Sequence, residues 1–165
     1  MRVVDITEIS AVVAAAGVLV GVVYYISDMR NQTKQRQMDM VMRLYSTFMS
    51  KEMSESLLVI LGLEYKTYDE FIEKYGMPSP EKPVWVAYMM VISFFNEVGM
   101  LLHRKFIDIE SVDELFAFRV ALYWERLKPW IEDMRKQLKG QVGDWFEYLY
   151  NEMKKKREQG SAQLG

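Results

Sequence analysis

The chain has 165 residues, of which 50% are hydrophobic and 27% are charged, a composition that excludes a disordered or collagen-like protein. It contains no cysteine and only one histidine, which excludes disulfides, thiolate metal sites and multi-histidine metal sites. The formal net charge of -2 gives no basis for a nucleic-acid-binding surface. We therefore expect no metal, no cofactor and no nucleic-acid partner.

An apolar segment near the N-terminus, Ile9–Ile26, has no charged residue and ends in two tyrosines and an isoleucine. About 20 apolar residues cross the roughly 30 Å hydrocarbon core of a bilayer, and tyrosines are enriched where the core meets the headgroups. Residues 1–26 are therefore predicted to form the N-terminus and a transmembrane anchor. Two alternatives stay open: a cleaved signal peptide, for which Asp5 and Glu8 are unfavourable flanking residues, and a buried helix of a soluble domain.

Basic residues concentrate on the C-terminal side of this segment. Arg2 precedes it, whereas Arg30, Lys34 and Arg36 follow it closely. The positive-inside rule then predicts a single-pass protein of the cell membrane, with its N-terminus outside and its C-terminal domain in the cytoplasm. Residues 27–37 are mostly polar and contain neither proline nor glycine, so we expect a helical stalk roughly 16 Å long.

Small residues recur along one face of the predicted anchor at spacings of four, three and four residues. Such residues let two membrane helices approach closely, and the last two of them form a GxxxG motif. We expect this face to contact a second copy of the chain or a helix of a membrane-protein partner; the alternative is that it faces lipid. The four residues are Ser10, Ala14, Gly17 and Gly21.

After the stalk, residues 38–158 are predicted to form a helical bundle, and residues 159–165 a disordered tail. No strand pattern is present, so the predicted class is all-α. The first helix of the bundle is expected to bury a face of apolar residues at three- and four-residue spacing. These residues are Met38, Val41, Met42, Tyr45, Phe48 and Met49.

Local signals mark several helix ends. Thr67 and Glu70 have the spacing of a capping box, and Gly76 follows at the other end of the same short helix. A second box, Ser111–Glu114, is expected to begin a helix that Pro129 either kinks or divides into two.

Val84–Leu102 is the most apolar element outside the anchor. We interpret it as the central helix of the bundle because Glu97 interrupts it, but a second membrane span remains open. A buried glutamate needs a cationic partner, so Glu97 is expected to pair with Arg119 or Arg104 and to fix the helix register.

The polar residues of this helix also suggest an alternative. Asn96 and His103 lie seven residues apart and therefore on the same helical face. Together with Glu97 and Arg119, they are a possible polar core or ligand site. No catalytic motif is present, so we assign no catalytic residue, and a binding protein is favoured over an enzyme.

Four basic residues near the C-terminus form the run Lys154, Lys155, Lys156 and Arg157. Such a run is usually a solvated helix end. Contact with anionic lipid is the alternative, because each basic residue near a membrane surface contributes about 1 kcal/mol.

Several motifs follow one another in the second half of the chain: Phe95–Leu102, Phe106–Asp108, Leu115–Phe116, Trp124, Leu127–Trp130 and Trp145–Leu149. In this order they resemble a prokaryotic family of small proteins that have an N-terminal membrane anchor and a helical domain of unknown function. The resemblance covers roughly residues 38–155 and implies an all-helical domain, without implying an activity.

These observations favour a membrane-tethered helical interaction module, an accessory or scaffold subunit whose partners are the lipid bilayer and either a membrane protein or a second copy. The alternative is a small-ligand sensor or enzyme with a pocket near Asn96, Glu97 and His103. A pocket that holds all three residues would favour the alternative, and a dry Glu97 paired with arginine would favour the module.

Overall fold

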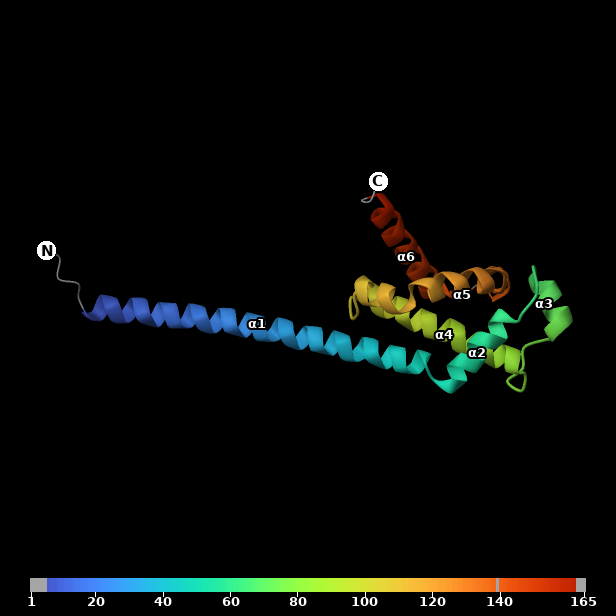
Figure 1. Ribbon diagram of the computed structural model, residues 1–165, viewed down its shortest axis with the longest axis horizontal. Helices are drawn as coiled ribbons and strands as arrows, with labels where there is room; N and C mark the ends of the chain where they lie inside the picture. Colours follow the sequence, from blue (N-terminus) through green and yellow to red (C-terminus); the bar gives the residue numbers. More distant parts are fainter. Residues whose placement is uncertain (1–5, 139, 163–165) are drawn as a thin grey trace. The chain divides into compact units, whose positions relative to one another are not determined.

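The computed structural model of the chain describes residues 6–138 and 140–162. Within these ranges the structure is helical and has no strand, which confirms the predicted all-α class (Figure 1). The helices are α1 (Ile6–Phe48), α2 (Lys51–Leu61), α3 (Tyr68–Tyr75), α4 (Pro83–His103), α5 (Ile109–Leu138) and α6 (Asp144–Ala162).

The chain divides into two units, residues 1–39 and residues 40–165. In the first unit, α1 continues without a break from the predicted anchor into the predicted stalk. Every residue from Val13 to Arg36 is exposed, including all the aliphatic residues of that stretch. Gln32 Nε2 donates to Asp28 Oδ2 at 2.8 Å within the helix. An apolar helix with no buried side along this length has nothing in its own unit to cover it.

In the second unit, α4 is the central helix. Pro83 occupies its first turn, where the missing N–H costs no hydrogen bond, and ten of its residues are buried. Tyr88, Phe95 and Val98 have no exposed surface. The helix contacts α2 and α6, while α5 contacts α6, α2 and α3 (Figure 1).

Two helices are apolar enough to span a membrane by length and composition: α1, from Val13 on, and α4. They differ in burial, because none of the apolar window of α1 is buried, whereas half of that of α4 is. The burial of α4 favours a bundle helix over a second span.

The bundle end of α1 differs from the expectation. The buried residues are Val41, Leu44 and Phe48, whereas Met38 and Met42 are exposed by 56% and 54%. The predicted apolar face over residues 38–49 is therefore correct for Val41 and Phe48 and in part for Tyr45, and wrong for the three methionines, Met38, Met42 and Met49. The helix carries two apolar stripes, and only the stripe with the branched and aromatic side chains enters the core.

Helix ends were predicted well where the signal is local. Thr67 Oγ1 accepts from Glu70 N at 3.2 Å and caps α3, and Gly76 ends this helix with φ of 79°. The box at Ser111 is wrong, because α5 already begins at Ile109. Asp108 caps it instead, since its Oδ1 accepts from Ser111 N at 2.8 Å.

The C-terminal helices are longer than expected. Pro129 lies inside a single α5, and α6 continues through Ala162, so residues 159–162 are helical rather than part of a tail. The remaining tail lies outside the described residues. Arg135 joins the two helices through Asp144 at 2.9 Å and Glu147 at 2.6 Å.

Candidate functional site

Asn96 of α4 caps the N-terminus of α6. Its Oδ1 accepts from Phe146 N at 2.9 Å. The first N–H groups of a helix have no partner inside the helix, so this side chain supplies one from fifty residues away. Asn96 is therefore engaged in the contact between two helices.

The same face of α4 stays against α6 for two further turns. A Cβ atom added at Gly99 would lie 1.9 Å from Trp145 O, so only glycine permits this approach. His103 is exposed, and its ring contacts Trp145 at 4.7 Å and Tyr148 at 5.2 Å between centroids. We call Asn96, Gly99 and His103 the α4–α6 seam.

The predicted pairing of Glu97 is wrong. Glu97 is exposed, and within the described ranges no ion pair joins it to Arg104 or Arg119. Arg119 instead donates to Leu115 O at 2.9 Å and lies over the Phe48 ring, 5.0 Å from its centroid. Glu97 is exposed because α4, although strongly apolar, is not covered on every side.

That open side of α4 borders an apolar groove of about 780 Å³. Val86, Met89, Ser93 and Glu97 follow one another along it at three- and four-residue spacing, and all four are exposed. Among the described lining residues Glu97 is the single charged one. The other walls come from the end of α1, from α2, from the loop before α4 and from α5, including Thr47, Met53, Pro78, Pro80, Trp130 and Met134. We call this feature the α4 groove.

The three candidate residues of α4 therefore do not meet in one cavity. Asn96 and His103 face α6, and Glu97 faces the α4 groove. The prediction that Asn96 and His103 share one helical face is confirmed, but the sequence did not indicate that α6 packs on this face. The groove was also not predicted, although the run of Val86, Met89 and Met90 beside a proline-rich loop was the available signal.

Two tyrosine hydroxyl groups, from the buried Tyr88 and the half-buried Tyr65, lie near the other end of α4. Tyr88 Oη donates to Tyr65 Oη, which donates to Arg126 O at 2.8 Å. Burial raises the pKa of Tyr65 to about 12 and raises the pKa of Tyr88 far above its usual range. Both phenols stay protonated at neutral pH and act as hydrogen-bond donors that join the loop after α2 to α5.

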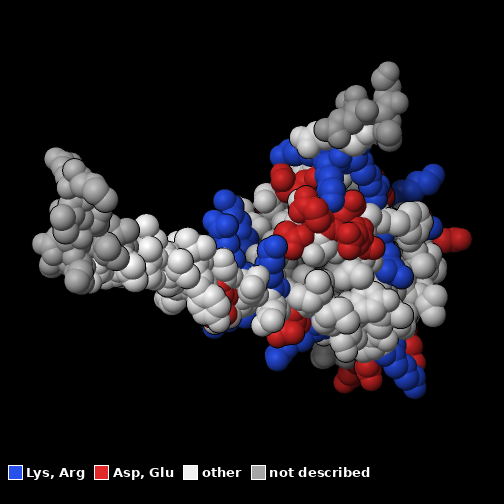
Figure 2. Space-filling view, turned by 60° about the vertical axis from the view of Figure 1, so that its left-hand side comes forward, with Lys and Arg blue, Asp and Glu red and all other residues white. Residues whose placement is uncertain are grey.

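The basic run at the end of α6 is partly engaged. Lys155 pairs with Glu152 at 2.7 Å, and Lys156 pairs with Asp113 of α5 at 3.2 Å. On the face drawn in Figure 2, acidic side chains gather in one patch with basic ones around it, and a wide uncharged area lies beside them. Lipid contact by Lys154, Lys155, Lys156 and Arg157 stays a prediction.

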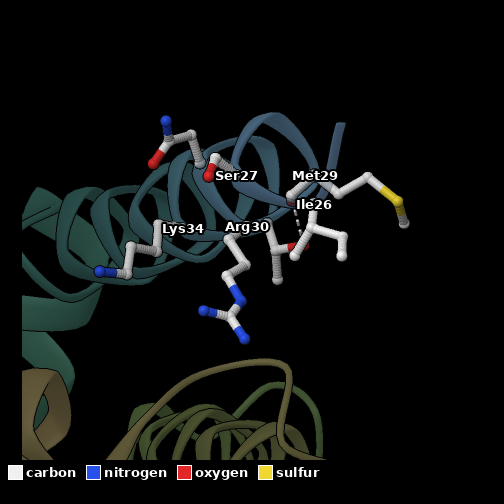
Figure 3. A pocket seen from close by; sticks show the side chains of 7 residues that line it. Ile26, Ser27, Met29, Arg30 and Lys34 are labelled. Carbon is white, nitrogen blue, oxygen red and sulfur yellow. Dashed lines mark hydrogen bonds between the residues drawn. The ribbon is translucent and has the colours of Figure 1, made fainter. Parts of the chain in front are cut away.

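The stalk part of α1 carries a shallow depression whose seven lining residues all belong to this helix. Arg30 and Lys34, one turn apart, project from the same side (Figure 3). Thr33 Oγ1 donates to Met29 O at 2.9 Å. A depression walled by one helix has no opposite wall to hold a ligand, so we assign it no site.

A family model, described as a domain of unknown function (DUF4760), matches residues 11–153. The chain belongs to this family. The match begins inside the apolar N-terminal segment and includes α4 and most of α6. No match was found among curated proteins, and none among solved structures. Over the described residues, no group of three or more histidine, aspartate or glutamate side chains is placed to hold a metal ion.

Proposed function

We propose that this protein is a membrane-tethered helical interaction module, whose bundle binds an apolar helical segment of a partner in the α4 groove. The first part of α1 supports the tether, because its aliphatic side chains are exposed and the basic Arg30 and Lys34 follow it. On this proposal the N-terminus is outside the cell, and the bundle is cytoplasmic.

The observation that carries the proposal is the α4 groove. Met89 is 60% exposed on the most apolar helix of the bundle, beside Val86 and the loop prolines. Methionine side chains adapt to many apolar surfaces, and an amphipathic helix in an apolar groove is a recurring mode of recognition. Glu97 at the groove favours a partner helix that carries a basic residue next to its apolar face.

The arrangement of the polar residues disfavours the sensor or enzyme. A small-molecule site needs polar groups that converge on one cavity, whereas Asn96 and His103 are held against α6 and Glu97 lies on a different face. Glu97 is also not the buried, paired residue that was expected to mark the module. The proposal therefore rests on the groove and not on Glu97 pairing.

The groove is tested by recovering partners from native membranes after crosslinking. Met89→Lys places a charge in the groove, and we expect at least a tenfold loss of partner yield, equivalent to about 1.4 kcal/mol. Leu58→Lys is the matched control, because Leu58 is 69% exposed on α2 and does not line the groove. Equal partner yields from both variants would overturn the role of the groove.

The tether is tested separately with a reporter fused after Gly165. We expect cytoplasmic reporter activity, because three basic residues follow the apolar segment closely and one precedes it. If protease added to intact cells digested the bundle, the proposed orientation would be wrong.

A further inference from the structure

The apolar stripe of α1 that the bundle does not use has the spacing of a coiled-coil seam. Met38 and Met42 are exposed, and Tyr45 is half-buried. Their spacing of four and then three residues corresponds to alternating d and a positions of a heptad repeat. At 100° per residue, the buried residues Val41 and Leu44 lie roughly 70° and 130° around the helix from the centre of this stripe, so the core does not bury Met42.

The same register continues toward the N-terminus through the stalk and the predicted anchor. Steps of three and four residues lead from Met38 back to Gln35, Asn31, Asp28 and Tyr24. They then reach the small residues Gly21, Gly17 and Ala14. All of these residues are exposed. The stripe of small residues and the methionine stripe therefore belong to one seam, which we call the α1 seam.

Resting on the proposed membrane tether, we propose that α1 pairs with α1 of a second copy as a parallel, in-register dimer along the α1 seam. Two copies inserted with the same topology are necessarily parallel. The depth of their anchors also aligns them in register. Membrane insertion therefore already orients the α1 seams of two copies toward the same parallel arrangement. The small residues allow the two backbones to approach inside the membrane.

Charge complementarity supports the same pairing. In this register Lys34 takes position g and Asp39 position e, five residues later. In a parallel two-stranded coiled coil, a g residue lies beside the following e residue of the other helix. Lys34 therefore faces Asp39 of the partner subunit, and the twofold symmetry repeats this pair. Within the described ranges neither residue takes part in an ion pair, so both remain available to the dimer.

The middle of the α1 seam contributes little to the stability of the dimer. Asp28, Asn31 and Gln35 are polar, so the stalk contributes specificity more than stability. Asp28 lies opposite Asp28 of the partner subunit, and this like-charge contact opposes association. We therefore expect association to depend on the two ends, the small residues of the anchor and the pair Met38 and Met42.

Single-cysteine crosslinking tests the α1 seam directly, because the natural chain contains no cysteine. Asn31→Cys, Gln35→Cys and Met38→Cys place thiols on the seam. Thr33→Cys, at position f, and Met29→Cys, at position b, place them on the opposite side, and both residues are exposed. In isolated native membranes under mild oxidation, we expect the seam variants to form disulfide-linked dimer at least ten times faster than the controls.

A charge swap then tests the register. Lys34→Glu in the Asn31→Cys background should slow crosslinking several-fold, because the introduced carboxylate and Asp39 of the partner subunit repel each other. Adding Asp39→Lys should restore the rate. Equal crosslinking at seam and control positions, no crosslinking at any position, or faster crosslinking at Met29 and Thr33 would each overturn the proposed dimer.

This experiment separates the dimer from the groove. Crosslinking that is faster at the seam positions than at the control positions is called phased crosslinking. If it occurs while Met89→Lys leaves the partner yield unchanged, the dimer is supported and the groove is refuted as a partner site. Loss of partner yield in Met89→Lys without phased crosslinking would leave the interaction module standing and refute the dimer.

Discussion

Gly99 is the position where the structure makes its sharpest energetic prediction. A Cβ atom at this residue would lie 1.9 Å from Trp145 O and 2.7 Å from Trp145 C. Both are backbone atoms, so no rotamer change relieves the contact, and α4 and α6 must move apart. Overpacking in a core costs about 1–3 kcal/mol, and a clash with backbone falls at the upper end of this range.

The change Gly99→Ala also brings a gain, because alanine is favoured over glycine inside a helix by about 1 kcal/mol. The expected net effect is a loss of about 2 kcal/mol in the free energy of unfolding. Gly160→Ala is the matched control: it lies in α6 with nothing within 4 Å of the added Cβ, and it should be neutral or stabilising.

The assay is urea denaturation of the full chain in mild detergent, followed by tryptophan fluorescence. Trp145 lies at the contact itself, so its environment reports on separation of the two helices. If the free energy of unfolding of Gly99→Ala were less than about 0.5 kcal/mol below that of the wild type, or were above it, α4 and α6 would not approach each other as described.

Three further changes have defined outcomes. Asn96→Ala removes the cap of α6 and should lower the free energy of unfolding by about 1 kcal/mol in the same denaturation assay. Asn96→Asp keeps an oxygen that can accept the hydrogen bond, so it should retain most of the stability that the cap contributes. Lys105, two residues after the end of α4, has φ of 59°, so Lys105→Gly should stabilise the protein by about 1 kcal/mol; destabilisation would contradict this backbone geometry. Hydrogen bonds from Ser111 lower the pKa of Asp108, so its contribution to stability is present above the unfolded pKa near 4 and is lost as pH falls through the lower, folded pKa. Asp108→Asn should therefore reduce the decrease in unfolding free energy between about pH 5 and pH 2, and an unchanged pH profile would refute the linkage.

The sequence predicted those features whose causes lie within a few neighbouring residues. The helix between Thr67 and Gly76 was predicted at both ends, because a cap and a terminating glycine act within one turn. Its length required no knowledge of the rest of the fold. The all-helical class follows for the same reason, since periodicity is local.

Features that depend on distant neighbours were not predicted. Whether Glu97 is buried depends on which sides of α4 receive α2 and α6, and nothing near Glu97 in the chain encodes that choice. The cap that Asn96 provides for α6 joins residues fifty positions apart, so no capping pattern reveals it. The two stripes of α1 have the same spacing, and only the packing of the bundle distinguishes Val41 from Met42.

The closure of α4 by α6 has a consequence for biosynthesis. α4 is apolar enough to span a membrane, and its cover at Gly99 arrives only when Trp145 and Phe146 have been made. At about 5–20 residues per second, the ribosome needs roughly 2–9 s to extend the chain from the end of α4 to that point. During this interval the side of α4 that receives α6 is uncovered, whereas α2, which precedes α4 in the chain, is already available to cover another side. The order of synthesis therefore makes the α6 side of α4 the last part of this apolar helix to be covered as the bundle forms.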